Sequence, residues 1–181
     1  MRTSLLGCLL LALASGALAH RLDEYLQATR VSVASNRIDV SLDFTPGVAV
    51  ADRVLAVIDQ DRDGNVSNDE RDTYARRVLE DLGAGLDEKA LALRLVDASF
   101  PALQEIKSGL GVIRIKAAAT VEQISSGRHT LSLTNTHLPA MSVYLVNALV
   151  PKDRAIQITK QTRDELQKGY RLEFVVVPSP P

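Results

Sequence analysis

Over most of its length this chain alternates apolar and polar residues with a period of two. In residues 38–44 every second residue is apolar and the residues between are Asp or Ser, as expected of a strand with one buried face. Residues 25–33 precede this segment across a Ser35-Asn36 turn and are its predicted hairpin partner. The other predicted strands are residues 91–95, 113–119, 131–133, 141–150, 156–158 and 170–177. Residues 141–150 are apolar on both faces, which predicts a central strand.

About seven or eight such strands, with mostly aliphatic core positions, predict a mainly β fold. The expected architecture is a β-sandwich, with an immunoglobulin-like arrangement among its forms. A chain of 181 residues suits one domain. The predicted organisation is a leader at residues 1–19, a single domain at residues 20–177 and a Pro-rich tail at residues 178–181.

Residues 47–83 break the two-residue period and predict two helices around a loop, inserted between the second and third strands. The first helix is expected just after a proline, where apolar residues can form a stripe through residues 48–58. In the second helix apolar residues recur every four positions, at Tyr74, Val78 and Leu82. A glycine often ends a helix, so this helix is expected to stop near Gly83 or Gly85.

The loop between these helices, residues 59–70, carries oxygen-bearing side chains at regular intervals. A twelve-residue calcium loop supplies ligands from its positions 1, 3, 5, 7, 9 and 12. Here those positions hold Asp59, Asp61, Asp63, Asn65, Ser67 and Glu70. Oxygen ligands in this number are what Ca²⁺ requires, with position 7 giving its backbone carbonyl and position 12 both carboxylate oxygens.

The order of the other loop residues favours calcium binding over an ordinary turn. Gly64 stands where the loop must turn sharply, and glycine permits a positive φ there. Val66 is the one apolar residue of the loop and is expected to attach it to a core. An exposed acidic turn has a similar composition. It has no reason, however, to place Glu70 six residues after the glycine.

Residues 47–83 therefore resemble the EF-hand family, with a match at every ligand position of the loop. The resemblance implies a helix–loop–helix unit with Ca²⁺ as its cofactor, in preference to Mg²⁺. EF-hands usually occur in pairs that contact each other through position 8, and this chain has no second loop with the ligand spacing. A single hand is expected to pack against another domain, against a second copy of the protein, or against neither.

The first nineteen residues predict export to the periplasm or the medium. Met1-Arg2 gives a positive start, a leucine-rich run follows, and Ala17-Leu18-Ala19 fits a small-residue cleavage site. The apolar run is too short for an ordinary membrane span. Cys8 also fits a lipoprotein cleavage box, which would leave little hydrophobic segment before the cut. Because Cys8 is the single cysteine, cleavage after Ala19 leaves a chain without disulfides.

Cleavage there would also make His20 the first residue. An α-amine and an imidazole on one residue form a chelating pair that suits Cu²⁺ or Ni²⁺. Residues 19–26 resemble the exported N-terminal region of hydrogenase and urease accessory proteins and of nickel/cobalt permeases, and periplasmic copper-resistance proteins begin in a similar way. The resemblance implies a transition-metal site at His20, although the membrane spans of the permeases are missing. His129 and His137 could add ligands only near His20, and otherwise we expect both on the surface.

Composition argues against several other classes of function. The chain has 21 Lys and Arg against 22 Asp and Glu, is 4% aromatic and lacks Trp, so nucleic acid is not an expected partner. It has no phosphate-binding loop, nucleophile elbow or metalloprotease helix, which predicts a non-enzyme. After the leader no apolar run is long enough for a transmembrane segment. A membrane or periplasmic protein is the candidate macromolecular partner.

Three functions then compete. The leading prediction is an exported calcium-binding protein in which Ca²⁺ stabilises the β-sandwich. The second is a protein that binds nickel, cobalt or copper through His20, or assists their transport. The third is a calcium-dependent module that binds another protein through a sheet edge or the helix pair.

Overall fold

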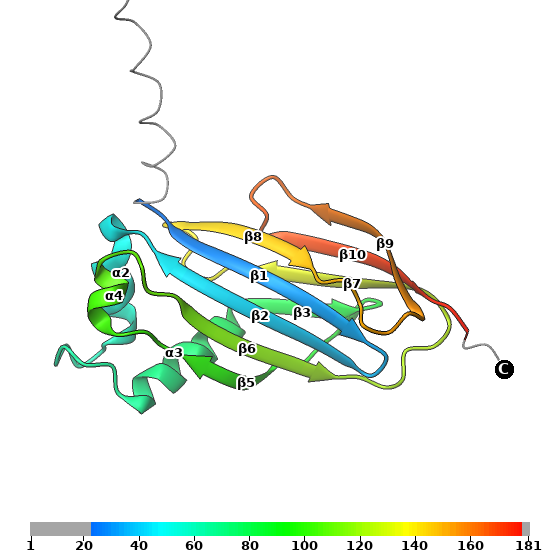
Figure 1. Cartoon of the computed structure of the whole chain (residues 1–181), viewed down its shortest axis with the longest axis horizontal. Coiled ribbons are helices and arrows are strands. Elements are labelled where there is room, and N and C mark those ends of the chain that lie inside the picture. The colour runs from blue at the N-terminus through cyan, green and yellow to red at the C-terminus, as the bar shows by residue number, and fades with distance from the viewer. Residues whose placement is uncertain (1–22, 179–181) are drawn as a thin grey trace, which may run out of the picture.

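The computed structural model describes residues 23–178 and is mainly β, with two five-stranded sheets. Figure 1 shows the sheets as two layers, with three helices gathered at one end. The predicted β class is thus confirmed, and the two sheets are consistent with a β-sandwich. The predicted leader at 1–19, His20 and the last three residues of the predicted tail lie outside the described residues.

The first sheet has the strand order β5-β6-β2-β1-β8. Its strands are β1 (Tyr25–Ala34), β2 (Arg37–Pro46), β5 (Arg94–Ser99), β6 (Ile113–Thr120) and β8 (Ser142–Ala148). β1 and β2 form the predicted hairpin, with Val31 opposite Val40. Buried residues alternate with more exposed ones along both strands, which confirms the period read from the sequence.

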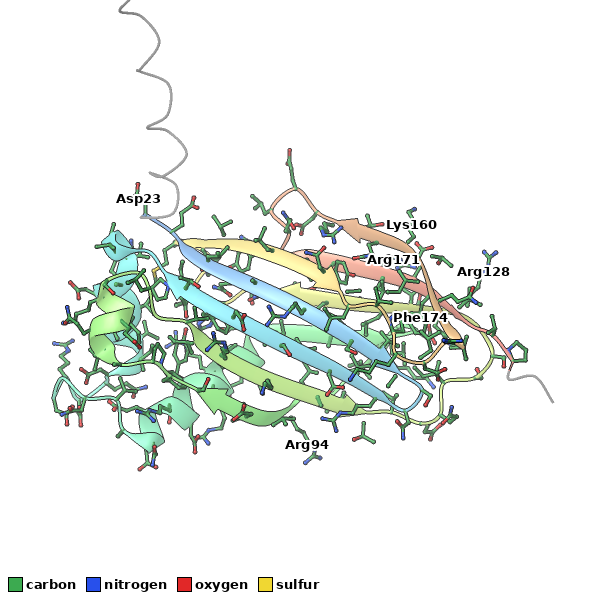
Figure 2. The ribbon with its side chains drawn as sticks, in the orientation of Figure 1. Asp23, Arg94, Arg128, Lys160, Arg171 and Phe174 are labelled. Atoms are coloured by element: carbon green, nitrogen blue, oxygen red, sulfur yellow. The ribbon has the colours of Figure 1, made fainter. Side chains whose placement is uncertain are left out.

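The second sheet has the strand order β4-β3-β7-β10-β9. Its strands are β3 (Leu82–Leu86), β4 (Lys89–Ala90), β7 (Gly127–Asn135), β9 (Ile156–Arg163) and β10 (Gly169–Val176). Two strands, β4 and β5, replace the one predicted at 91–95, and β3 was not predicted as a strand, so the described residues hold ten strands rather than seven or eight. Figure 2 shows Arg128, Lys160 and Arg171 on β7, β9 and β10, at the end of the sheets away from the helices.

β8 is an edge strand that pairs in parallel with β1, so the prediction of a central strand was wrong. Tyr144 and Val146 of β8 are buried, whereas Leu145 on the other face is 40% exposed. Arg163 of β9 covers part of the free edge by donating from Nε to the carbonyl of Val146 at 2.7 Å. A charged side chain over an edge protects it from pairing with other strands. The strand can therefore be apolar on both faces without lying in the middle of a sheet.

The helices are α2 (Val48–Ile58), α3 (Asn68–Glu80) and α4 (Leu103–Lys107). α2 and α3 follow one another between β2 and β3, as predicted, and α4 lies between β5 and β6 and packs on α2. α2 buries a full apolar stripe against this end of the sheets, made up of Val50, Ala51, Val54, Leu55 and Ile58. α3 is mostly polar and buries only Tyr74, Ala75 and Val78.

α3 ends earlier than the glycines predict. Its last residue is Glu80 and its C-cap is Asp81, while Gly83 and Gly85 both lie in β3. A Cβ on Gly85 would lie 3.0 Å from the Ser132 hydroxyl and 3.3 Å from the Lys89 carbonyl. Gly85 therefore permits close approach of neighbouring strands and does not cap the helix.

Candidate metal site

The loop between α2 and α3 is held at both ends by helix caps. At its start Asp59 caps α2, with its N–H donating to the carbonyl of Leu55. At its end Ser67 caps α3: its hydroxyl accepts from the N–H of Glu70, and the Glu70 carboxylate accepts from the N–H of Ser67. This reciprocal arrangement is a capping box, and it fixes the first turn of α3 relative to the loop.

Three carboxylates converge inside the loop. One oxygen each from Asp59, Asp61 and Asp63 lie within 4.8 Å of one another, the one such acidic group among residues 23–178. Asp61 and Asp63 are exposed, whereas Asp59 is half-buried. The Oδ1 atom of Asp59 is out of contact with solvent and has no hydrogen-bond partner among the described residues. A buried carboxylate oxygen left without a donor is costly, and a cation would satisfy it.

Backbone N–H groups of the loop hold the aspartates in place. Asp61 accepts from the N–H of Asp63 at 3.1 Å, and Asp63 accepts from the N–H of Asn65 at 2.7 Å. Asp59 accepts from the N–H of Gly64 at 3.2 Å through its second oxygen, Oδ2. Gly64 itself has a φ of 81°, in the region that glycine adopts without strain. The predicted turn at this glycine is confirmed.

Glu70 reaches from the first turn of α3 across the loop to its start. Its Oε1 accepts from the N–H of Gln60 at 2.7 Å, and its Oε2 accepts from the Ser67 hydroxyl at 2.8 Å. Hydrogen bonds from Ser67, and then from Gln60 and Asp61, lower the pKa of Glu70 and keep its carboxylate charged. The last predicted ligand is therefore ionised and joins the two ends of the loop.

The remaining predicted ligands serve the loop in other ways. The side chain of Asn65 is exposed, in keeping with a position that contributes its carbonyl. Ser67 is engaged as the helix cap, and position 9 of a calcium loop often acts through a water molecule. Val66 is half-buried and packs against the core, as predicted. The set offers only oxygen donors and several negative charges, which suits a hard cation such as Ca²⁺.

A buried hydrogen-bond network behind α3 has no counterpart in the sequence predictions. Tyr74 of α3 bonds through its hydroxyl to the hydroxyl of Tyr25 on β1 and, at 3.0 Å, to Nε2 of His137. Nδ1 of His137 lies 2.8 Å from Oδ2 of Asp81, the C-cap of α3. The prediction that His137 lies on the surface was wrong, because the residue is 0% exposed.

Further polar side chains hold His137 rigidly. Its N–H donates to Oδ1 of Asn135 at 3.0 Å, and its carbonyl accepts from Gln27 and from the Tyr144 hydroxyl, each at 2.8 Å. Asn135 in turn donates to Gln27 at 3.0 Å. Buried polar groups with every partner in place specify one arrangement of the chain around them. Nothing in the spacing of these residues signals the network, because they come from β1, β7, β8 and α3.

His129 is likewise partly buried, with its side chain 11% exposed, rather than a surface residue as predicted. Its Nδ1 lies 2.6 Å from Asp87 and its Nε2 2.8 Å from the Ser125 carbonyl. Both of these partners are acceptors, so the site favours the protonated imidazole, which has a donor on each nitrogen. Burial lowers the pKa of His129, but the bonds to Asp87 and Ser125 outweigh burial and raise it.

Searches against known proteins add no identification. No protein-family model matches the chain, and no curated protein matches it in sequence. Among residues 23–178, no helix is long and apolar enough to cross a membrane.

Proposed function

We propose that this chain is an exported, non-enzymatic calcium-binding protein whose loop 59–70 binds one Ca²⁺ as an EF-hand does. The observation that carries the proposal is the convergence of Asp59, Asp61 and Asp63, with a buried oxygen of Asp59 that lacks a partner. Without an ion, several carboxylates repel one another in a small volume. An ion would remove that repulsion and tie Glu70 on α3 to Asp59 at the end of α2.

The role we propose for the ion is structural. In calcium sensors the ion opens a helix pair and exposes an apolar groove. Here the apolar stripe of α2 is already buried, with Val50, Val54 and Ile58 each at most 3% exposed, and α4 packs on the same helix. The ion would therefore stabilise this packed arrangement of the helices rather than open it. The predicted immunoglobulin-like topology and the binding of another protein remain predictions.

The expected gain in stability is modest. Extracellular modules of this type bind Ca²⁺ with a Kd of about 10⁻⁴ to 10⁻³ M. At about 1 mM Ca²⁺ and a Kd of about 10⁻⁴ M, binding adds about 1.4 kcal/mol to the free energy of unfolding. For a domain without disulfides this is a useful fraction of a total of about 5 to 15 kcal/mol.

Isothermal titration calorimetry with Ca²⁺, paired with thermal unfolding, tests the proposal. Glu70→Gln removes one charge and the bidentate ligand, so we expect at least about a tenfold loss of affinity and loss of the calcium-induced rise in Tm. Glu80→Gln is the matched control, because Glu80 is an exposed residue of the same helix. Absence of a calcium heat in the unmodified protein, or equal binding by Glu70→Gln, would refute calcium binding at this loop.

The transition-metal function depends on His20, which lies outside the described residues. The two described histidines are bonded to carboxylates on different elements, His129 to Asp87 and His137 to Asp81. We therefore assign neither of them to a shared transition-metal site.

A further inference from the structure

The helix that begins in the candidate calcium loop ends at a buried histidine. Glu70 lies in the first turn of α3, and Asp81 caps its C-terminus. His137 is 0% exposed and bonds to Asp81 through Nδ1 and to Tyr74 through Nε2. Two of the residues that anchor α3 to the sheets therefore meet on one imidazole ring.

The hydrogen bonds around this ring have a fixed direction. Asp81 is a carboxylate and only accepts, so Nδ1 of His137 carries the proton that is donated to it. In the neutral ring Nε2 then accepts from the Tyr74 hydroxyl, and Tyr74 accepts from the hydroxyl of Tyr25. Every donor in this row of hydrogen bonds has an acceptor. Tyr25, the last residue of the row, is 0% exposed.

Protonation of His137 removes the acceptor at Nε2. Nε2–H must then donate to the Tyr74 oxygen, and whichever way the bond between Tyr74 and Tyr25 runs, one of their two hydroxyl protons is left without an acceptor among the described residues. A buried donor without a partner destabilises the arrangement that contains it. The contacts that hold α3 are weakened as a result.

The surroundings of the His137 ring shift its pKa in opposite directions. Burial lowers the pKa of His137, the bond and the charge of Asp81 raise it, and Arg77 of α3 lowers it, with burial dominant. From β8 the neutral Tyr144 bonds the His137 carbonyl, and Lys168 lies 5.7 Å above the Tyr144 ring. Burial raises the pKa values of Tyr25, Tyr74 and Tyr144, so all three phenols are neutral.

We propose that His137 makes calcium binding at loop 59–70 pH-dependent: protonation of the buried ring loosens α3 and weakens the ion site, and bound Ca²⁺ in turn opposes that protonation. The inference rests on the proposed calcium function and adds a regulator to the same site. Thermodynamic linkage requires the two effects to be equal in size. The loop would thus release its ion more readily as the exported protein meets acid.

The coupling must pass through the helix rather than through space. Glu70 and Asp81 are separated by about 16 Å at the helical rise of about 1.5 Å per residue. Over that distance in salt solution, repulsion between Ca²⁺ and a charged imidazole changes the affinity by less than about twofold. A larger effect that persists at high salt would identify the movement of α3 as its cause.

Nuclear magnetic resonance titration of the histidine ring protons, with and without saturating Ca²⁺, tests the coupling directly. We expect the Kd for Ca²⁺ to rise by about fivefold on protonation of His137, at the lower end of typical couplings between sites. The pKa of His137 should fall on calcium binding by the logarithm of the same factor. His129 is the internal control, because its partners are Asp87 and Ser125 and none lies on α3.

A second arm compares the Kd for Ca²⁺ at pH 7.5 and pH 5 in the unmodified protein and in His137→Asn. The loop carboxylates are the same in both proteins, so only the unmodified protein should show the additional weakening. If His137→Asn does not fold, the ring-proton titration of the unmodified protein decides. An unchanged His137 pKa while Ca²⁺ binds would overturn the coupling and leave the calcium function intact. No calcium binding at pH 7.5 would overturn both.

Discussion

Replacement of Tyr74 by Phe should destabilise the protein more than any other single loss of a hydroxyl in the buried network. The Tyr74 hydroxyl is bonded on one side to Tyr25 and on the other to Nε2 of His137, at 3.0 Å. All three residues are at most 1% exposed, so no solvent can replace a lost partner. Tyr74→Phe therefore leaves two polar groups unsatisfied at once, while the apolar packing of the ring is kept.

The magnitude follows from that count. Each buried group left without a partner costs about 1 to 3 kcal/mol, so Tyr74→Phe, which leaves two, should lower the free energy of unfolding by about 2 to 6 kcal/mol. Tyr25→Phe keeps the bond from Tyr74 to His137 and should lower it by only about 1 kcal/mol. In the double variant no tyrosine hydroxyl is left orphaned, so its loss should be smaller than the sum of the two single losses by about 1 kcal/mol.

Urea unfolding of the four proteins, followed by circular dichroism, gives the complete double-mutant cycle. Equal m-values would show that the comparison concerns stability and not the size of the unfolding unit. A loss of unfolding free energy below about 0.5 kcal/mol for Tyr74→Phe would contradict a buried, fully bonded hydroxyl, since surface changes are of that size. Equal and additive losses for the two single variants would contradict it as well.

Two further substitutions probe the other polar features. Asp87→Asn removes the carboxylate partner of His129, whose raised pKa means that the protonated ring stabilises the fold fully below about pH 6.5 and ever less as the pH rises through that raised pKa. Burial raises the pKa of Asp87, but the bonds from His129 and Thr130 lower it overall. The difference in unfolding free energy between the unmodified protein and Asp87→Asn, measured in urea, should therefore be about 0.5 to 1 kcal/mol for this partly exposed pair, largest between about pH 4 and pH 6.5 and smaller above it. A difference that grows with pH would contradict the pairing. Gly64→Ala places a Cβ in open space but at a φ of 81°, so the backbone strain of about 1 kcal/mol should lower the free energy of unfolding in urea by about that amount, with Gly83→Ala, at ordinary φ, as the control.

The sequence predicts most of the strands because a half-buried strand has a local signature. The alternation in residues 38–44 reports directly which side chains of β2 face the core. The position of a strand within its sheet has no such signature, since β8 is apolar on both faces and lies at an edge. Only its partner β1 and the covering Arg163, both distant in sequence, decide that position.

The candidate site likewise has one part with a local sequence signature and one part that depends on residues far apart in the sequence. The loop ligands lie within twelve consecutive residues, so their spacing alone predicts that Asp59, Asp61 and Asp63 converge. The network behind α3 includes a bond between residues 110 positions apart, Gln27 and His137. Tyr74 is visible in the sequence only as part of an apolar stripe, and the role of its hydroxyl depends on what the fold places against it.

The network also limits what bound calcium can do to α3. A sensor-like rotation of this helix would break the bonds of Tyr74 to Tyr25 and to His137, and the bond of Asp81 to His137. It would also break two bonds to the Asp81 carbonyl, from the N–H and from the hydroxyl of Thr136, each at 2.9 Å. At about 1 kcal/mol for each hydrogen bond, such a rotation costs more than about 4 kcal/mol. A calcium site with a Kd of about 10⁻⁴ M supplies only about 1.4 kcal/mol at about 1 mM Ca²⁺. Calcium bound at this affinity would therefore be too weak to drive the helix out of its place.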